Sequence, residues 1–599
     1  SATGVAFTRN PSTGKNVFYG EWLPNAQGED VVAGIRTPLP VNEAGKTEHN
    51  QGLPSLETAM PACYIELDQI QRRLERHYRE MQDIEFTIED GRLWMLQCRT
   101  GKRNGVAAVK IVVDMVNEGL ISKEEAVSRV SADQLVQVLL PMVAPEAESS
   151  ATRLTKGLPA GPGGAHGMVV FTADEAARRG KELKEQVILV RNETSPEDVH
   201  GMHAAQAILT AKGGMTSHAA LVARGWGRCC IVGCGDLQID VEHKTLQVGD
   251  HILHEGDWVT LNGTAGYVYQ GKLDLIDPYL EQNQDYTQLM EWVDGLRKLR
   301  VRTNADTPAD ARKALYFGAE GIGLFRIEHM FYGEGSDEPL FKLRKMIMSK
   351  TEKERRAALD ELFPHIKADI KATLAVMDGY PVTIRLLDPP LHEFVPHQPA
   401  ARRKLADELA IDLDELTRRA EGLHETNPMM GHRGVRLGIS YPEITETQVR
   451  AILEAAAELV QEGVNVHPEI MIPVLGHVDE LKHQKEIVDE VYRQVLEKYG
   501  VDKIPYMLGT MIEIPRAALT AGKIAEVAEF FSYGTNDLTQ MGFGFSRDDI
   551  GGFLPDYLSH KILPDDPFQT IDQEGIGELI DIAIQRGRKT RPALKVGIC

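Results

Sequence analysis

The sequence predicts an α/β protein built from several domains, and three observations support this prediction. With 599 residues the chain exceeds the size of a single hydrophobic core. Its first hundred residues alternate short strands with turns, whereas beyond residue 295 apolar strands alternate with amphipathic helices. Together with a linker-like composition near residue 145, these changes predict four regions, residues 1–105, 106–154, 155–270 and 271–599.

The overall composition is that of a globular protein with a marked negative charge. Apolar residues make up 42% of the chain and charged residues 26%, and the formal net charge is −22. This charge disfavours nucleic acid and anionic membranes as partners, and no apolar stretch reaches the ~18 residues of a membrane span. We therefore expect a cytoplasmic protein. The sequence begins and ends inside domain-like patterns, so we expect a fragment of a longer chain, whose organelle targeting stays open.

The six cysteines do not predict a disulfide framework in a chain of this length. Cys229, Cys230 and Cys234 lie close together, but no second pair of His or Cys residues completes a zinc-binding pattern. We expect reduced, buried thiols.

The first region ends in a predicted hairpin, Met81–Gly101. Apolar and polar residues alternate in its first strand, which indicates a half-buried strand with Asp83 and Glu85 on the polar face. Gln97 and Arg99 share one face of the returning strand. The four side chains meet only if the turn holds an odd number of residues, so we predict a three-residue connection with Gly91 in a bulge, which places Glu85 opposite Gln97. A solvated acidic strand also explains the two carboxylates.

The second and third regions differ in periodicity. Residues 106–140 have helical spacing, and the following segment, PMVAPEAESSATRLTKG, has the composition of a linker. Residues 155–270 contain short strands around the segment GGMTSHAALVARGWGRCC. The nearby GPGGAHG imitates a dinucleotide-binding fingerprint, but a strand, Met168–Phe171, follows it rather than a helix, so we reject that interpretation.

His218 lies where this segment begins a helix. Thr216 or Ser217 can cap the helix, and Gly225 can end it. The first turn of a helix favours an anion and disfavours a charged imidazole, so a neutral, nucleophilic His218 is consistent with the pattern. A phosphate-binding turn and an ordinary structural histidine fit as well, and the residues alone favour the structural histidine.

The fourth region predicts a parallel sheet with helical crossovers. Seven strands with polar ends suit a (β/α)8 barrel without its eighth unit. The predicted strands are Val301–Asn304, Gly321–Phe325, Val382–Leu387, Glu469–Val474, Tyr506–Ile512, Phe530–Tyr533 and Lys595–Cys599. Among the predicted helices are Thr307–Phe317, Glu446–Glu462 and Val478–Tyr499.

Polar residues at the carboxyl ends of barrel strands are candidates for catalysis. Arginines suit carboxylate and phosphate oxygens, and two carboxylates can hold Mg²⁺ against a developing enolate. Any one of these residues can instead belong to a structural ion pair, such as Arg326 with Glu328. The candidates at strand ends are Arg326, Arg385, Glu513, Asp537 and Cys599, and a further candidate, Arg433, lies in the segment NPMMGHRGVRLG.

The segment around His218 closely resembles the phosphohistidine motif of the pyruvate, phosphate dikinases. Phosphoenolpyruvate (PEP) synthases and enzyme I of the sugar phosphotransferase system have similar motifs, but these typically carry Arg where Met215 stands and lack the double cysteine. The resemblance extends along nearly the whole chain. It implies a partial ATP-grasp domain that includes the Met81–Gly101 hairpin, a swivelling phosphohistidine domain, and a PEP/pyruvate-binding TIM barrel lacking its last unit.

The resemblance also implies a role for each candidate. His218 would carry the phosphoryl group, and Cys599 would be the acid/base that moves the methyl proton. Mg²⁺ would be held at Glu513 and Asp537, with a monovalent cation as a further cofactor. Thr216 matches the site that a regulatory kinase phosphorylates in plant members, and the family implies a homodimer. The implied substrate-binding residues are Arg326, Arg385, Arg433, Glu513, Gly534, Thr535, Asn536 and Asp537, and the implied ATP/AMP-binding residues are Asp83, Glu85, Gln97 and Arg99.

The activity implied for the parent protein is ATP + phosphate + pyruvate ⇌ AMP + diphosphate + PEP. One histidine must then reach two sites, so we expect the middle domain to swing, with the linker at Pro145–Lys156 as its hinge. The alternatives are a PEP synthase, which uses water as acceptor, and an enzyme I-like protein that passes phosphate to another protein. We expect this chain by itself to be inactive in the full reaction, because the resemblance places a nucleotide-binding lobe and a barrel unit outside it.

Overall fold

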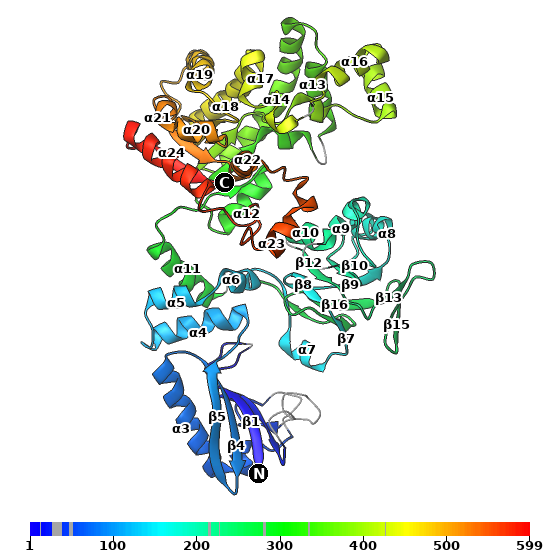
Figure 1. Ribbon diagram of the computed structural model, residues 1–599, viewed down its shortest axis with the longest axis vertical. Coiled ribbons are helices and arrows are strands. Elements are labelled where there is room, and N and C mark those ends of the chain that lie inside the picture. Colours follow the sequence, from blue (N-terminus) through cyan, green and yellow to red (C-terminus); the bar gives the residue numbers. More distant parts are fainter. Residues whose placement is uncertain are drawn as a thin grey trace. The chain divides into compact units, whose positions relative to one another are not determined.

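The structure, a computed structural model, describes the chain except residues 12, 27–38, 47–51, 214–216, 227, 279–282, 333–335 and 426. Met215 and Thr216 therefore lie outside the described residues. The chain forms two compact units, Ser1–Lys298 and Leu299–Cys599, each a mixture of helices and strands, which confirms the α/β multidomain fold class (Figure 1). No helix in the described part of the chain combines the length and the apolar character needed to cross a membrane.

The first unit begins with an antiparallel sheet in the order β3-β2-β1-β4-β5, covered by helix α3 (Figure 1). Ile84, Phe86 and Ile88 are buried, as the alternation in the sequence predicts. The elements are β1 Ala2–Phe7, β2 Tyr19–Pro24, β3 Leu39–Pro40, α2 Leu56–Ala59, α3 Pro61–Tyr78, β4 Gln82–Glu89 and β5 Arg92–Thr100.

The hairpin of β4 and β5 confirms the predicted pairing but corrects the way in which it arises. Glu85 lies opposite Gln97, as predicted. The connection, however, holds two residues, Asp90 and Gly91, both with positive φ, rather than three. The extra residue is Leu96 in β5, where the register shifts between Glu85 and Phe86. A one-residue bulge inside the strand moves the following side chains to the opposite face of the sheet. A turn with an odd number of residues would have the same effect.

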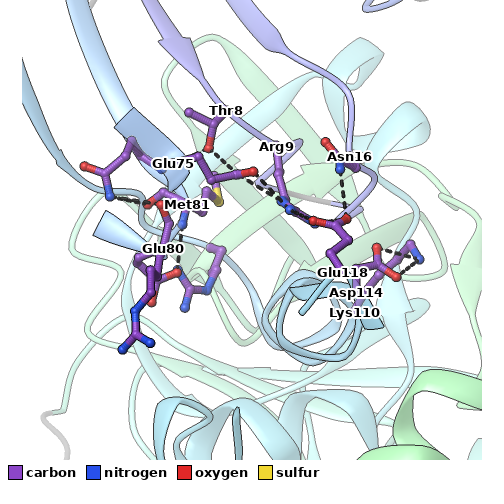
Figure 2. A network of polar contacts seen from close by, with 12 residues as sticks. Thr8, Arg9, Asn16, Glu75, Glu80, Met81, Lys110, Asp114 and Glu118 are labelled. Atoms are coloured by element: carbon purple, nitrogen blue, oxygen red, sulfur yellow. Dashed lines mark hydrogen bonds and ion pairs between the residues drawn. The ribbon is translucent and has the colours of Figure 1, made fainter. Parts of the chain in front are cut away.

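A buried arginine joins this sheet to the helices that follow (Figure 2). The side chain of Arg9 is fully buried and donates to both carboxylate oxygens of Glu75, at 2.9 and 3.0 Å, and of Glu118, at 3.2 and 2.6 Å. Thr8 and Asn16 donate to the same two carboxylates. Glu75 lies in α3 and Glu118 follows α4, Gly105–Asn117, so one guanidinium fixes three segments.

The helical segment includes a helix from a later part of the sequence. Helices α4, α5 (Lys123–Arg129) and α6 (Ala132–Val138) share a core with α11 (Gln284–Leu296), whose Leu289 and Trp292 are buried in it. Residues 271–298, which the sequence pattern assigned to the fourth region, therefore belong to the first compact unit. The sequence pattern does not indicate that α11 packs against α4, α5 and α6, because these helices are far apart along the chain.

The middle of the first unit is an eight-stranded sheet in the order β7-β17-β16-β9-β10-β11-β12-β8, with a small second sheet β13-β14-β15. Strands β9 to β12 run parallel, and helices α8 to α10 accompany them. The bounds are β8 Leu158–Gly161, β9 Gly164–Val170, α8 Ala173–Ala177, β10 Val187–Arg191, α9 Val199–Ala204, β11 Ala207–Thr210, α10 His218–Gly225, β12 Cys229–Val232, β13 Gln238–Asp240, β14 Thr245–Val248, β15 His251–His254, β16 Trp258–Asn262 and β17 Tyr267–Gln270.

The segment predicted as a linker contains a short helix and a strand. It forms α7, Pro145–Ser150, and β7, Arg153–Lys156, which pairs with β17. The Glu148 carboxylate accepts from Asn262 at 2.7 Å and from Tyr269 at 2.6 Å, which fixes α7 to the sheet. Just before it, β6 (Met142–Val143) pairs with β18 (Leu275–Ile276).

The second unit contains a seven-stranded parallel sheet in the sequential order β19-β20-β21-β22-β23-β24-β25, as predicted for this part of the chain. Its strands are β19 Thr303–Asn304, β20 Ile322–Arg326, β21 Pro381–Arg385, β22 His467–Ile472, β23 Met507–Ile512, β24 Phe530–Tyr533 and β25 Lys595–Ile598. Its helices are α12 Pro308–Tyr316, α13 Asp337–Ile347, α14 Glu352–Val376, α15 Pro399–Leu409, α16 Leu413–Leu423, α17 Val435–Ser440, α18 Pro442–Gln461, α19 Val478–Tyr499, α20 Pro515–Leu519, α21 Ala521–Ile524, α22 Thr535–Phe543, α23 Leu554–Ser559 and α24 Ile576–Thr590.

Strands β21 and β22 each end two residues earlier than the apolar runs predict, and both ends lie at the candidate site. Strand β21 stops at Arg385, because the N–H of Leu387 bonds to the Gln448 side chain at 2.7 Å instead of continuing the ladder. Strand β22 stops at Ile472, and Val474 takes a positive φ of 59°. The core between sheet and helices is continuous and largely aliphatic.

Candidate active site

His218 is the first residue of α10, in the middle of the first unit. The next residues, Ala219 and Ala220, pack into the core between sheet and helices, whereas the His218 side chain is only half buried. The N–H of Ala220 donates to the Ser217 hydroxyl at 3.5 Å, so Ser217 caps the start of the helix. The ring is therefore not sealed inside an apolar core.

A threonine from the neighbouring strand end orients the His218 ring. The Oγ1 of Thr194 lies 3.0 Å from Nδ1 of His218. Thr194 follows β10 and His218 follows β11, and these two strands are parallel neighbours, so both residues stand at the carboxyl edge of the sheet. When Nδ1 donates its proton to the hydroxyl, the lone pair remains on Nε2, which is the arrangement a nucleophilic imidazole needs.

In the second unit, the carboxyl ends of the strands carry the predicted polar residues. Arg326 ends β20, and its backbone N–H and guanidinium both donate to Asp306, each at 2.8 Å. His329 contacts the same carboxylate at 2.8 Å. The predicted alternative, an ion pair of Arg326 with Glu328, does not form, because Glu328 instead pairs with Arg385.

Arg385 and Arg433 converge on Asp388. Asp388 lies 3.0 Å from the Arg385 guanidinium and 2.8 Å from that of Arg433, which also donates to Asp537 at 3.0 Å. Burial alone would lower the pKa of both arginines, but the surrounding carboxylates raise it, so both guanidiniums stay charged. Two buried cations held by acidic neighbours form a rigid pair of donors.

Glu513 follows β23 and is almost fully buried, next to Asp388 and Asp537. Burial, reinforced by these two carboxylates, raises the pKa of Glu513 well above that of an ordinary glutamate, although Arg433 and Arg385 oppose the shift. Its Oε1 accepts the N–H of Val474 at 2.5 Å. A Cβ on Gly534 would lie 2.9 Å from Glu513 Oε2, so only glycine allows β24 to end this close to the carboxylate.

The fit of this region to Mg²⁺ follows from its donors. No group of three or more His, Cys, Asp or Glu residues in the described part of the chain stands ready to enclose a metal ion. Glu513 and Asp537 nevertheless supply two hard oxygen ligands. Mg²⁺ binds through one or two carboxylates and keeps several waters, so the residues present fit the ion.

Cys599 follows β25 and lies near the same cluster. Its carbonyl accepts the hydroxyl and the N–H of Thr535, at 2.7 and 3.3 Å, and its N–H donates to Tyr533 at 3.0 Å. Burial raises the pKa of the Cys599 thiol, although Arg385 and Arg326 pull it down. Cys599 as a whole residue is nevertheless exposed. Asn536 is exposed in the first turn of α22, beside Asp537.

Several buried polar atoms of this cluster have no hydrogen-bond partner. They are the Nε atoms of Arg326 and Arg385 and Oε2 of Glu328. Buried polar groups are normally paired, so unpaired groups at the end of a parallel sheet mark a place where a polar ligand completes the network.

The nucleotide candidates on the N-terminal hairpin also meet on one face. Arg99 donates from Nε to Asp83 at 2.8 Å and lies 3.7 Å from Glu85, which faces Gln97 across the strands. Asp83 is buried, and its Oδ1 has no hydrogen-bond partner. The predicted convergence of these four residues is thus present, in the register that the Leu96 bulge produces.

The cysteine cluster is part of the core. Cys229, Cys230 and Cys234 are buried, and burial raises the pKa of the thiols of Cys229 and Cys234 to about 12. Such thiols are unreactive, in agreement with the expectation of buried, reduced cysteines.

Sequence reasoning missed three residues that hold the predicted ones, namely Thr194, Asp306 and Asp388. Each follows a parallel strand in the sequence. The rule that selected the arginines, polar residues just beyond a strand, would have selected Asp306 and Asp388 as well. Thr194 gives no signal in the sequence, because its role depends on the neighbouring strand.

Comparison with known proteins agrees with this geometry. The PEP-binding domain of PEP-utilising enzymes matches residues 280–599, which is more than half of the chain. The chain belongs to the family of PEP-utilising enzymes. The mobile domain of PEP-utilising enzymes matches residues 183–266, which include His218. The AMP/ATP-binding domain of pyruvate phosphate dikinase matches residues 41–120, which include the hairpin of β4 and β5.

Curated members of the PEP-utilising enzymes resemble the whole of this chain. A pyruvate, phosphate dikinase of Clostridium symbiosum is 52% identical over 600 residues, and the one of Rhizobium meliloti (strain 1021) is 53% identical over 600 residues. The chloroplastic pyruvate, phosphate dikinase 1 of Arabidopsis thaliana is 53% identical over 601 residues. Each alignment covers 100% of this chain but only 60% to 66% of the relative, so the chain spans about two thirds or less of their length.

Proposed function

We propose that the protein to which this chain belongs interconverts ATP, phosphate and pyruvate with AMP, diphosphate and PEP, through phosphorylation of His218. The observation that carries the proposal is the group of side chains at one end of the parallel sheet of the second unit. Two arginines, two carboxylates and a thiol lie at or just beyond the ends of its strands, and Arg433 joins them from the loop before α17. This set suits a substrate with carboxylate, phosphoryl and enolate oxygens and one methyl proton to move. The dikinases of similar sequence support the same reaction.

The PEP half-reaction can be written with the residues of this chain. Arg385, Arg433 and Arg326 hold the carboxylate and phosphoryl oxygens of PEP. The lone pair on Nε2 of His218 attacks phosphorus, so a P–N bond forms while the P–O bond to the enolate breaks. The enolate carbon then takes the proton of the Cys599 thiol, which gives pyruvate and a thiolate. Burial raises the pKa of the Cys599 thiol, so the thiol carries a proton when the enolate forms.

Mg²⁺ bound by Glu513 and Asp537 would polarise the enolate oxygen and offset its negative charge. Asp388 holds Arg385 and Arg433 in place, so the donors need little rearrangement when PEP enters. On the nucleotide side, we propose that Asp83, Glu85, Gln97 and Arg99 contribute to the binding of ATP or AMP and its metal ion. Gly534, Thr535 and Asn536 complete the proposed PEP site, and a monovalent cation is part of the same proposal.

The proposal also covers the location, the oligomeric state and the regulation of the protein. A cytoplasmic homodimer follows from the family resemblance, as does Thr216 as the target of a regulatory kinase in plant-type members. Thr216 lies two residues before His218, so phosphate on its hydroxyl would place negative charge beside the ring and repel an incoming phosphoryl group. Sedimentation of the parent protein tests the dimer.

The half-reaction gives a direct test with the chain as it stands. The purified chain is incubated with Mg²⁺ and PEP labelled in its phosphoryl group, and we expect acid-labile, alkali-stable label on His218. His218→Ala should abolish the label, whereas the control His251→Ala, an exposed histidine in β15, should keep it. Label that survives His218→Ala contradicts the assignment, and so does a wild-type chain that takes up no label.

A second measurement separates the dikinase from its alternatives. With the parent protein in the direction of PEP formation, a dikinase consumes phosphate and releases diphosphate, whereas a PEP synthase requires no added phosphate. A phosphocarrier of the enzyme I type would label an acceptor protein without nucleotide. The match of residues 41–120 to an AMP/ATP-binding domain favours an enzyme that uses nucleotide.

A further inference from the structure

Val474 has an unusual backbone conformation beside the candidate site. It lies two residues beyond β22, is completely buried, and has φ of +59°. It is the one β-branched residue among the described non-glycine residues with positive φ. Branching at Cβ makes this conformation unfavourable, so it persists only where the surroundings enforce it, and such positions concentrate at functional sites.

The conformation directs the backbone N–H of Val474 at Glu513. Strand β22 ends at Ile472, so Val474 is released from the ladder, and its N–H donates to Oε1 of Glu513 at 2.5 Å. A carboxylate that accepts a backbone N–H is held more rigidly than one fixed only by flexible side chains. The orientation of Glu513 therefore depends on the left-handed backbone at residue 474.

The side chain of Val474 contacts the segment that carries Arg433. A Cβ built on Gly434 would lie 2.7 Å from Cγ2 of Val474, so the isopropyl group packs directly on the backbone of Gly434. The adjacent N–H of Val435 donates to the carbonyl of Pro473 at 3.1 Å. The N–H of Gly434 in turn donates to the carbonyl of Asp388 at 3.1 Å.

We propose that Val474 is a positioning residue that sets the spacing between Arg433 and Glu513. Its N–H fixes the carboxylate, and its side chain fixes the backbone next to the guanidinium. Glycine would adopt the same φ without strain but would lose the contact with Gly434, and valine in an ordinary conformation would lose the bond to Glu513. Only the strained valine makes both contacts. The inference rests on the proposed function, in which Arg433 and Glu513 act on the same substrate.

The two contacts are tested separately. Replacing Val474 by its α-hydroxy acid, through nonsense suppression, turns the amide into an ester and removes only the N–H while keeping the side chain. We expect the rate constant for PEP-dependent labelling of His218 to fall roughly 10- to 100-fold, as for the loss of a hydrogen bond to a charged group. Val474→Ala keeps the N–H and removes the contact with Gly434, so we expect mainly a rise in the KM for PEP.

The matched controls are the same ester and alanine changes at Val488, a fully buried valine of α19 that does not contact the cluster. Both should label His218 at nearly the wild-type rate. Thermal unfolding is followed for every variant. An ester at 474 that labels within about twofold of wild type overturns the proposal, and so does an equal loss of rate with the ester at 488, because a general loss of packing would then explain both.

A measurement without phosphoryl transfer separates this inference from the proposed function. The binding of Mn²⁺ in the presence of oxalate is followed by electron paramagnetic resonance. Oxalate is a planar dianion with oxygens on two adjacent carbons, as in the enolate and its carboxylate. We expect weaker Mn²⁺–oxalate binding in the Val474 ester than in the Val488 ester. If the wild-type chain takes up no label, the proposed function fails, but this comparison still decides the role of Val474, and equal binding in the two esters refutes it.

Discussion

The predicted site residues depend on partners that hold them in place. Arg326 is fixed by Asp306, Arg433 by Asp388, and the His218 ring by Thr194. None of these pairs is local in the sequence, since 20, 45 and 24 residues separate their members. Candidate residues can therefore be found from strand ends, whereas their orientation requires the folded sheet.

Asp306 provides a test at the level of one residue. Asp306→Asn keeps the shape of the side chain but weakens its hold on the Arg326 guanidinium and on His329. We expect the KM for PEP in the labelling of His218 to rise roughly tenfold, with a smaller change in the maximal rate. Asp310→Asn, an exposed aspartate in the first turn of α12, is the control. An unchanged KM would mean that Asp306 does not position Arg326 for substrate.

Thr194 provides a second test. Thr194→Val removes the hydroxyl at nearly constant volume, so the His218 ring loses the partner of Nδ1. We expect labelling by PEP to slow roughly tenfold, with unfolding nearly unchanged. Thr194→Ser, which retains the hydroxyl, should restore most of the rate. A valine variant as fast as wild type would show that the ring needs no such partner.

At the scale of elements, prediction was reliable where one periodicity continued and poor where a local irregularity intervened. Helix α19 has the predicted bounds, Val478–Tyr499, and β24 the predicted Phe530–Tyr533. The bulge at Leu96 could not be foreseen, because an odd turn and a bulge within a strand produce the same facing of residues. Segment 145–156 has a linker composition, yet β7 pairs with β17 and the Glu148 carboxylate attaches α7 to the sheet.

Glu148 provides a test of how firmly segment 145–156 is attached to the sheet. Glu148→Ala removes the acceptor shared by Asn262 and Tyr269, so α7 should detach from the sheet. We expect the free energy of unfolding of this region to fall by about 1–3 kcal/mol and protease cleavage within residues 145–156 to increase. Glu146→Ala, exposed on the same helix, is the control. Equal cleavage of the two variants would show that Glu148 does not hold this segment on the sheet.

The outer helices of the second unit provide a pH-dependent test. Burial would raise the pKa of Glu458, but hydrogen bonds from Lys367, Lys371 and Tyr499 lower it to about 2. Because the pKa is depressed in the folded state, the stabilisation is fully present above the ordinary glutamate value of about 4.3 and is lost as the pH falls towards 2.

The measurement compares urea unfolding of the wild-type chain with that of Glu458→Gln. We expect the variant to be less stable by roughly 0.5–1 kcal/mol at neutral pH, and the difference to shrink between about pH 4 and pH 2. Glu486→Gln, an exposed glutamate of α19, should match the wild type throughout. A difference that stays constant down to pH 2 would contradict the lowered pKa.

At the scale of the whole molecule, the two compact units divide the proposed half-reaction between them. Residues 1–298 carry His218, and residues 299–599 carry the arginine and carboxylate cluster. Produced separately, the first unit should take label from PEP only when the second is added, at a rate that increases with its concentration. The rate should be below that of the joined chain, because a tether supplies an effective concentration of about 1 mM.

The separated units also contain their own control. His218→Ala in the first unit should block labelling even with an excess of the second. If the first unit takes up label without the second unit, the PEP site does not lie in the second unit, and the proposed assignment of the two sites is contradicted.

The sequential order of the seven strands has a consequence for folding. The cluster takes Asp306 from the first strand end and Cys599 from the last, with the other members spread between them. No short segment of the chain can assemble a partial version, and contacts with large sequence separation form slowly. During refolding, labelling of His218 by PEP should therefore return later than the circular dichroism signal of the helices. Catalytic activity then measures the last stage of folding, in which the complete sheet forms.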